Sequence, residues 1–254
     1  PRPRDHQIER GIFGESTLAL IGAALAGIAL GFVGVWLALW LPMAIEQEEA
    51  AWVAKAQGTA PAESPTVTVQ RIRQALVASK LQMTVFVAIT MLACLWIVHS
   101  AGWTPKSGVL ILLAAALVSL ALADWRTQLL PDAITQPMLW LGLIVQLHPA
   151  TQITGIDQAV LGAVIGYLLP WSIGVVNLLM GREGAVGGGD LKLVAVLGAW
   201  FGPIPALLSL CFGSLLVVLV YGTLLVMGKR RASEPLPFGP WLVAAAMVWI
   251  LLKA

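Results

Sequence analysis

The chain has 254 residues, of which 59% are hydrophobic and only 11% are charged, and its formal net charge is +2. Soluble domains carry about 25% charged residues, whereas residues 65–254 of this chain include only six carboxylates. Because so few charges cannot cover a surface exposed to water, the composition predicts an integral membrane protein and excludes a large soluble domain. The small net charge, with no basic run interleaved with aromatic residues, excludes a nucleic-acid-binding surface.

Eight apolar runs follow one another along the chain and predict an all-α, polytopic membrane protein with about eight transmembrane helices. Two of the runs, 136–148 and 191–203, are shorter than the roughly 20 residues that a span needs, so they either borrow flanking residues or are partly re-entrant. The runs are 17–43, 81–98, 107–124, 136–148, 158–180, 191–203, 206–227 and 239–252.

The first run, 17–43, is too long for the hydrophobic core of a signal peptide, so a transmembrane helix is expected there. The polar segment 44–80 contains the low-complexity piece 60–65 and is predicted to be a loop between a helical start and the next helix. These features define an N-terminal membrane region, 1–106, that includes this loop.

The distribution of Lys and Arg predicts the orientation of the spans. If successive spans alternate in direction, the positive-inside rule places four segments, which hold ten of the 15 Lys and Arg residues, in the cytoplasm and both chain ends outside. Three arginines in the N-terminal tail favour the opposite orientation. The four segments are 44–80, 125–135, 181–192 and 228–238.

Two aspartates lie at predicted inner ends of helices, where they could meet. Asp124 ends the apolar run before Arg126, and Asp190 follows Gly187, Gly188 and Gly189. Taken singly, Asp124 could be a helix-end carboxylate at the lipid headgroups, paired with Arg126, and Asp190 could be a helix N-cap. Three successive glycines permit unusual backbone conformations and close approach of another chain segment, which favours a functional site.

Two carboxylates that lie close together in a low-dielectric site share one proton. The ionised carboxylate can take a proton from water while the protonated one polarises a scissile carbonyl, which is aspartic-protease chemistry and needs neither metal nor cofactor. Other hydrolytic designs lack support, because the three histidines are scattered and no Gly-x-Ser-x-Gly motif occurs. Cys94 and Cys211 lie inside apolar runs and are interpreted as small buried hydrophobic residues, so no metal site is predicted.

Three motifs, in order, resemble those of bacterial type IV prepilin peptidases. The segment 123–135, with Asp124, Pro131 and Asp132, is similar to the first aspartate motif of that family, and 187–193 is similar to its Gly-x-Gly-Asp motif. The segment 236–240 resembles the Pro-Phe-Gly-Pro sequence before its last helix. The resemblance implies a Gly-x-Gly-Asp membrane aspartic protease fold, with a peptidase core at 107–254.

By this resemblance the two catalytic aspartates are Asp124 and Asp190. Asp132 is expected to play a structural or substrate-positioning role, because it follows Pro131 in a turn and could cap the next helix. Lys192 is expected to be an anchor whose side chain extends to the headgroups rather than a catalytic group. The three glycines, Pro131, Asp132 and Lys192 are supporting residues of the motifs.

The first cytoplasmic loop departs from the family, because it is short and lacks the paired Cys-x-x-Cys motifs that go with a zinc site and with N-methylation of the trimmed pilin. The resemblance therefore implies a multi-pass enzyme of the bacterial inner membrane whose site faces the cytoplasm. It would cut the basic leader from a prepilin or pseudopilin whose hydrophobic helix lies in the lipid bilayer. It does not indicate which pilus, secretion or conjugation system is served, nor an oligomeric state.

Three alternatives stay open. The chain could be a bifunctional peptidase and N-methyltransferase, which the missing cysteines disfavour. It could be a proton-coupled transporter, although the carboxylates of a relay would be spread across the bilayer. It could also be a catalytically inactive scaffold in pilus assembly.

Overall fold

The structure, a computed structural model, describes residues 3–57, 80–181, 187–229 and 236–254. Within these residues the regular structure is entirely helical. This outcome follows from the environment, because a segment surrounded by lipid must satisfy its backbone N–H and C=O groups internally, as a helix does. The prediction of an all-α polytopic membrane protein is confirmed.

The helices follow the predicted apolar runs in chain order. They are α1 (Pro3–Gln57), α3 (Lys80–Ala101), α4 (Pro105–Thr127), α5 (Asp132–Ile144), the short 3-10 helix η1 (Val145–Leu147), α6 (Ile156–Leu179), α7 (Gly188–Phe201), α8 (Pro203–Val226) and α9 (Gly239–Lys253).

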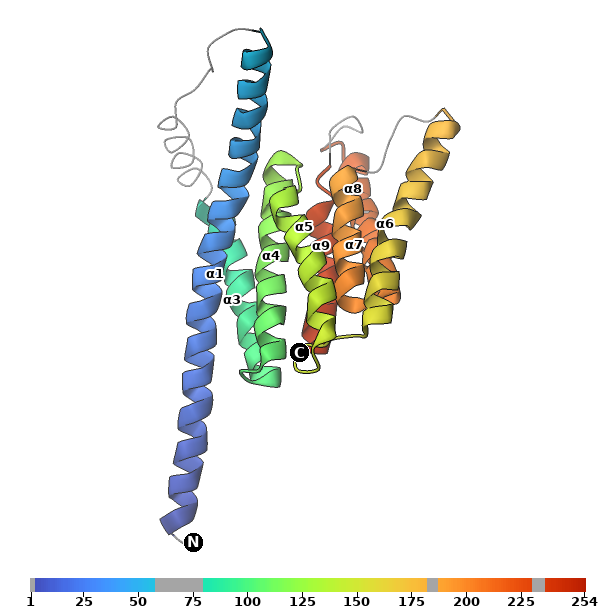
Figure 1. Cartoon of the computed structure of the whole chain (residues 1–254). Helices are drawn as coiled ribbons and strands as arrows, with labels where there is room; N and C mark the ends of the chain where they lie inside the picture. Colours follow the sequence, from blue (N-terminus) through green and yellow to red (C-terminus); the bar gives the residue numbers. More distant parts are fainter. Residues whose placement is uncertain (1–2, 58–79, 182–186, 230–235) are drawn as a thin grey trace.

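Five of the described helices are long and apolar enough to cross a membrane: the part Ser16–Ile45 of α1, and α3, α4, α6 and α8. The helices α5, α7 and α9 have 13, 14 and 15 residues, which corresponds to about 20 Å each. Figure 1 shows that α5 and α7 run between the two ends of the bundle instead of returning to the end from which they start. The re-entrant interpretation of 136–148 and 191–203 is therefore wrong.

Helix α1 is longer than the predicted span 17–43 and extends beyond the other helices at both ends of the bundle (Figure 1). The difference has a local cause at residues 46–57, which are rich in Glu, Gln, Ala and Lys and so continue the helix past the apolar run. Part of the predicted loop 44–80 is thus helical, and its residues 58–79 lie outside the described part of the chain.

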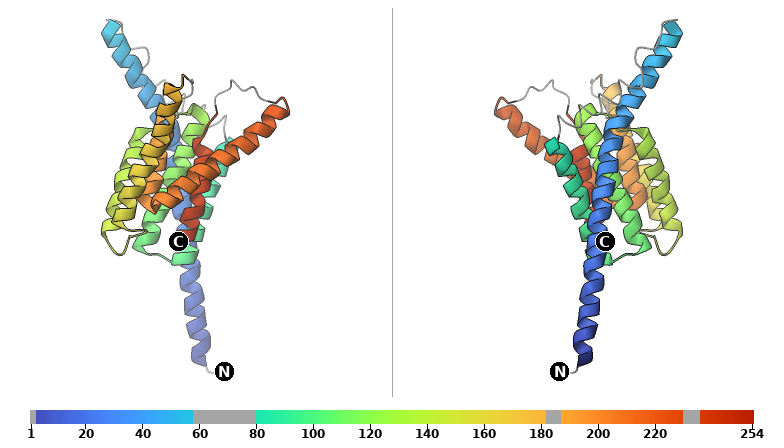
Figure 2. Two further views of the ribbon diagram at one scale, coloured as in Figure 1. Left: turned by 90° about the vertical axis from the view of Figure 1, so that its right-hand side faces the viewer. Right: turned by 90° about the vertical axis from the view of Figure 1, so that its left-hand side faces the viewer.

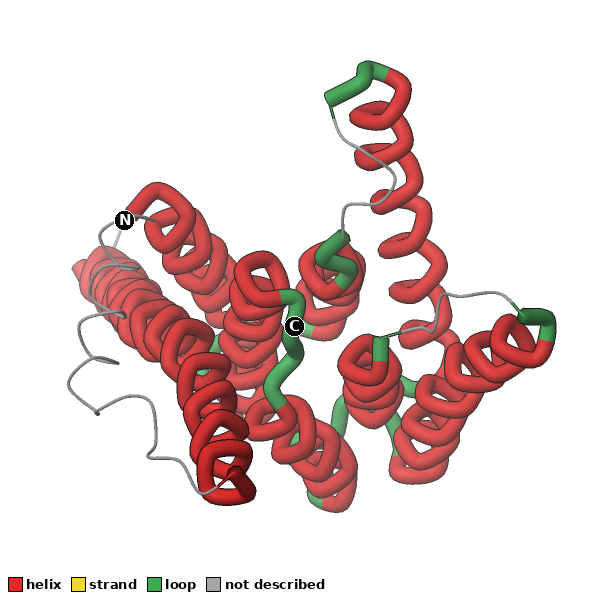
Figure 3. Tube along the Cα trace, turned by 90° about the horizontal axis from the view of Figure 1, so that it is seen from above, coloured by secondary structure: helices red, strands yellow, loops and turns green. Residues whose placement is uncertain are grey.

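Successive helices alternate in direction. We call the end where α1, α4, α6 and α8 finish the upper end, as it is drawn in Figure 1, and the opposite end the lower end. The helices α3, α5, α7 and α9 begin at the upper end. There α6 and α8 diverge from the rest of the bundle, as the views from the side and from above show (Figures 2 and 3).

Helix α4 forms the centre of the bundle and packs against α1, α3 and α9. Its N-terminus is fixed by a capping box, in which Thr104 and Ser107 exchange hydrogen bonds, and by Pro105 at the first helical position. From Leu110 to Asp124 nearly every side chain is buried. A helix with this much burial offers a rigid support for the carboxylate in its last turn.

The lower half of α7 is held tightly. Gly198 of α7 meets the backbone of Gly162 in α6, with no room for a side chain at either position. The indole N–H of Trp200 donates to the Met138 carbonyl at 2.8 Å, and the amide of the buried Gln146 donates to carbonyls at the end of α7. The lower part of α7 is thereby locked against α5 and α6.

Candidate active site

Asp124 lies in the last turn of α4, at the upper end of the bundle, and is only 5% exposed. Its Oδ2 accepts a hydrogen bond from the backbone N–H of Gly239, the first residue of α9, at 2.8 Å. Helix α4 ends just beyond, because Gln128 adopts a left-handed conformation (φ 56°) and donates its N–H to the Asp124 carbonyl. Asp124 is thus a helix-end carboxylate, as the sequence predicts, and it is buried and receives a backbone donor from another helix.

Gly239 leaves no room for a side chain next to this carboxylate. A Cβ built on Gly239 would lie 2.9 Å from Oδ2 of Asp124, closer than side-chain carbons approach such atoms in proteins, and 3.1 Å from its Cγ, which is an unusually tight contact. The segment 236–240 therefore does more than start the last helix, since it brings a backbone donor into contact with the first aspartate. This contact is not visible in the sequence.

Asp190 is the third residue of α7 and is half-buried. The N-cap of α7 is Gly187, so the interpretation of Asp190 as the N-cap is wrong. Burial, and after it the negative charge of Asp124, raise the pKa of Asp190 to about 7. Helix α4 ends and α7 begins at the upper end, and Gly189, next to Asp190, packs against Leu130, six residues beyond Asp124. Both predicted aspartates therefore lie at this end of the bundle.

The three glycines before Asp190 differ in their surroundings. A Cβ on Gly187 would lie 2.9 Å from Oδ2 of Asp190, and one on Gly189 would lie 2.9 Å from Cβ of Leu130, whereas Gly188 has nothing within 4 Å. None of the three has a positive φ angle. The expected close approach is therefore present at Gly187 and Gly189, but the expected unusual backbone conformation is absent.

Asp132 and Lys192 form an ion pair between α5 and α7, in which Nζ of Lys192 lies 2.7 Å from both Oδ1 and Oδ2 of Asp132. The N-cap of α5 is Pro131, so the expectation that Asp132 caps this helix through its side chain is wrong. Lys192, which the sequence predicts to be an anchor at the headgroups, is held by a carboxylate of the neighbouring helix. The two supporting residues of the separate motifs thus bind each other.

The described part of the chain contains no group of three or more His, Cys, Asp and Glu side chains arranged to hold a metal ion. What the upper ends of α4, α7 and α9 offer instead is a pair of carboxylates, one backbone N–H directed at Asp124, and low exposure to water. Chemically, such a site can hold a proton between two carboxyl groups and transfer it to and from a bound group.

Comparisons with known proteins match this region. Residues 111–223 match the model of the Type IV leader peptidase family, and this stretch contains both aspartates. Three similar proteins are each named prepilin leader peptidase/N-methyltransferase, and each alignment covers 156 residues and 59% of this chain. They come from Dickeya chrysanthemi (44% identical, 53% of that protein), Pseudomonas aeruginosa (40%, 51%) and Stutzerimonas stutzeri (39%, 51%).

The chain spans about half the length of the curated relatives it matches. No solved structure is significantly similar to it. The matches confirm the resemblance to bacterial type IV prepilin peptidases, and they lie in the part of the chain that carries the two carboxylates.

Proposed function

We propose that the chain is a membrane-embedded aspartic endopeptidase that removes the short basic leader from type IV prepilins or pseudopilins. The observation that carries this proposal is that Asp124 lies in the last turn of α4 and Asp190 in the first turn of α7, at the same end of the bundle, where Gly189 packs against Leu130, six residues beyond Asp124. The names of the similar proteins support the substrate class.

The surroundings of the two carboxylates suggest different roles. The carboxylate of Asp124 accepts the Gly239 N–H, which stabilises its negative charge, whereas burial of this side chain acts in the opposite direction. Burial and the charge of Asp124 raise the pKa of Asp190 to about 7, so a large share of this group is protonated near neutral pH. We therefore assign the general base to Asp124 and the proton donor to Asp190, with the pair titrating as a unit.

In the proposed reaction Asp124 removes a proton from water, and the oxygen of that water attacks the carbonyl carbon of the scissile peptide bond. Asp190 donates its proton to the carbonyl oxygen, which gives a neutral tetrahedral intermediate. In the collapse of this intermediate, Asp124 donates the proton that it took from water to the leaving nitrogen, and ionised Asp190 takes a proton from one hydroxyl group. The C–N bond breaks, the hydroxyl oxygen becomes the carbonyl oxygen of the new acid, and both carboxyl groups return to their starting protonation. Each proton is transferred between the two carboxyl groups and the substrate, so no further group is required.

The depth of the site suits a substrate that lies partly in the bilayer. Both aspartates belong to terminal turns of their helices, while five apolar helices define the membrane-embedded part. A prepilin helix in the bilayer would present its leader at this end of the bundle. We place the upper end at the cytoplasmic face of the bacterial inner membrane, because ten of the 15 Lys and Arg residues belong to the four sequence segments for which the positive-inside rule predicts a cytoplasmic location.

In this proposal the two parts of the chain have different roles, one catalytic and one structural. The segment 107–254 contains Asp124, Asp190 and Gly239 and would carry the chemistry. The segment 1–106 supplies α1 and α3, which pack against α4 and so support the helix of the first aspartate.

N-methylation is the second candidate activity, because the names of the similar proteins include it. The absence of paired Cys-x-x-Cys motifs from the sequence disfavours it here. A proton-coupled transporter is disfavoured too. The carboxylates of a proton relay would be spread across the depth of the bilayer, whereas Asp124 and Asp190 both lie at one end of the bundle.

A cleavage assay tests the proposal. The chain is co-expressed with a prepilin encoded in the same genome, and leader removal is followed by gel shift and by the intact mass of the pilin. Wild type is compared with Asp124→Asn and Asp190→Asn. The matched control is Asp157→Asn, the same chemical change at an exposed position in the first turn of α6, at the lower end.

Cleavage by wild type and by Asp157→Asn, with none by the other two variants at equal protein levels, is the expected result. Cleavage that persists in Asp190→Asn contradicts the carboxylate mechanism. A wild type that cuts no prepilin favours the transporter or the inactive scaffold. The same mass spectrum shows whether the new N-terminus carries a methyl group.

A further inference from the structure

The two halves of α7 are held in different ways. The lower half is fixed by the Gly162–Gly198 contact and by hydrogen bonds from Gln146 and Trp200. Asp190 lies in the first turn, at the other end of this 14-residue helix. How that first turn is held therefore decides where the Asp190 carboxylate lies.

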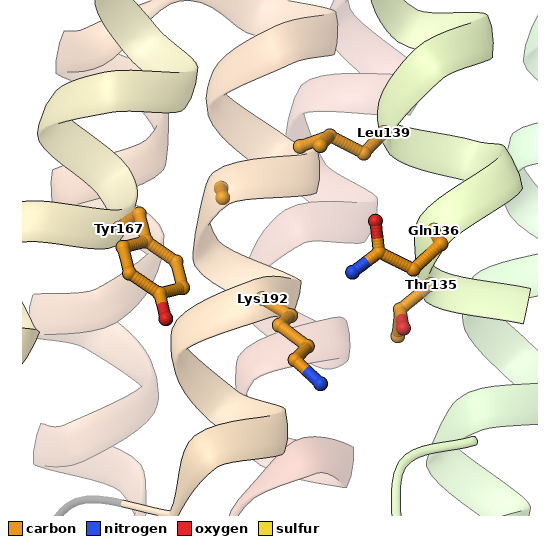
Figure 4. A pocket seen from close by; sticks show the side chains of 6 residues that line it. Thr135, Gln136, Leu139, Tyr167 and Lys192 are labelled. Carbon is orange, nitrogen blue, oxygen red and sulfur yellow. The ribbon is translucent and has the colours of Figure 1, made fainter. Parts of the chain in front are cut away.

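The packing around the upper half of α7 is incomplete. A cavity of about 270 Å³ lies between α5, α6 and α7, and Figure 4 shows side chains of all three helices directed into it. Such a void offers no contacts that oppose a shift of α7 toward α5 or α6. The lining residues are Thr135, Gln136, Leu139, Tyr167, Lys192 and Ala195.

The ion pair between Asp132 and Lys192 joins the upper ends of α5 and α7, two of the three helices that border this cavity. Both carboxylate oxygens of Asp132 lie 2.7 Å from Nζ of Lys192, which fixes the ammonium more tightly than a single contact. Lys192 is two residues after Asp190 on the same helix, so a displacement of Lys192 carries the catalytic carboxyl group with it. On the opposite side, Gly189 packs against Leu130 and limits movement without forming a bond.

We propose that Asp132 and Lys192 are positioning residues, and that their ion pair sets the place of Asp190 relative to Asp124. This inference rests on the proposed peptidase function. It assigns neither residue a contact with the substrate. The pair is partly exposed, with 32% and 59% of the Lys192 and Asp132 side chains accessible, so it contributes little to global stability and its removal should leave the protein folded.

The test is a double-mutant cycle made of Asp132→Asn, Lys192→Met and the double variant. If the two residues act as one unit, each single change lowers kcat about 10-fold and leaves KM within about twofold, because small displacements of a catalytic group are costly. The double variant is then no slower than the slower single variant, since the unit is already broken. Lys192→Arg, which keeps the charge and the two donors, retains most of the activity.

Hydrogen exchange of the same detergent-solubilised variants supplies a readout that does not depend on activity. Amides of residues 190–195 should exchange faster in each variant that lacks the ion pair, while those of 196–201 stay as in wild type. The matched control is Lys80→Met, which removes an exposed lysine at the upper end, in the first turn of α3. It should change neither kcat nor exchange.

Additive losses in the double variant, or a raised KM with unchanged exchange, would overturn the inference and indicate separate contacts with the substrate. Unchanged exchange alone would also overturn it, whatever the activity. If wild type shows no cleavage, the proposed function fails, whereas the exchange experiment still decides whether the ion pair holds the first turn of α7.

Discussion

Gly239 makes the contact on which the geometry of Asp124 depends. Its N–H donates to Oδ2 at 2.8 Å, and its missing side chain lets α9 come that close to α4. A backbone donor is set by the fold rather than by a rotamer, so it holds the carboxylate at little entropic cost.

Replacing Gly239 with Ala should therefore impair catalysis more than folding. The added Cβ would lie 2.9 Å from Oδ2 of Asp124, so either the carboxylate or the start of α9 must move. We expect the cleavage rate to fall about 10- to 100-fold, as for other small displacements of catalytic groups. The control is Gly222→Ala in α8, where a Cβ meets nothing within 4 Å, and which should cleave at the wild-type rate.

The pH dependence of cleavage follows from the pair of carboxyl groups. Burial and the charge of Asp124 raise the pKa of Asp190 to about 7, and this group must be protonated to donate. The rate should therefore fall as the pH rises through about 7. It should also fall in acid, where the base becomes protonated, which gives a bell-shaped profile of kcat/KM. A flat profile over this range, with the cleavage step limiting, would contradict the shared-proton mechanism.

The sequence identifies the two aspartates as candidates because ionisable residues are rare in apolar runs and stand out. It does not indicate that Asp132 pairs with Lys192, because these residues are 60 positions apart and their contact depends on the register of α5 against α7. The sequence does not indicate the hydrogen bond from Gly239 to Asp124 either. The two residues are 115 positions apart, and Gly239 donates through its backbone N–H, which every residue except proline has.

At the scale of the helices, the apolar pattern predicts the order of the helical segments in the described part of the chain, because each run must form a helix in lipid. It fails at the ends of α1, where polar helix formers continue the helix to Gln57. It also fails to indicate how α7 is anchored. That depends on Gln146, a polar residue inside a predicted span that becomes 3% exposed and connects η1 with the end of α7.

Gln146 should be essential for stability although it is far from the aspartates along α7. Its amide donates to carbonyls of residues 142, 199 and 200, and its Oε1 accepts the N–H groups of residues 153 and 154. Gln146→Leu would leave these buried backbone groups without partners, at a cost of about 1–3 kcal/mol for each group that water cannot reach. The midpoint of thermal unfolding in detergent should fall markedly. Gln158→Leu, at an exposed position of α6, should leave it nearly unchanged, and equal midpoints would contradict this account.

At the scale of the whole molecule, alternation of the helices places the starts of α5, α7 and α9 and the end of α4 at one end of the bundle (Figure 1). The two aspartates, the Gly239 donor and the ion pair all come from these termini. A site assembled from four helix ends depends on the topology, because reversing one helix would remove its contribution. The orientation of the bundle in the membrane therefore decides on which side the site works.

The proposed orientation predicts which positions a membrane-impermeant maleimide reaches from outside the cell membrane. In a background with Cys94→Ala and Cys211→Ala, single cysteines are introduced by Lys229→Cys at the upper end and by Ala150→Cys at the lower end, both at exposed positions. In intact spheroplasts Ala150→Cys should react, whereas Lys229→Cys should react only after the membrane is permeabilised. The reverse pattern would place the aspartates outside, where a leader retained in the cytoplasm could not reach them. By the positive-inside rule, the arginines of the N-terminal tail favour the opposite orientation. The charges alone therefore do not determine the orientation, and the labelling result does.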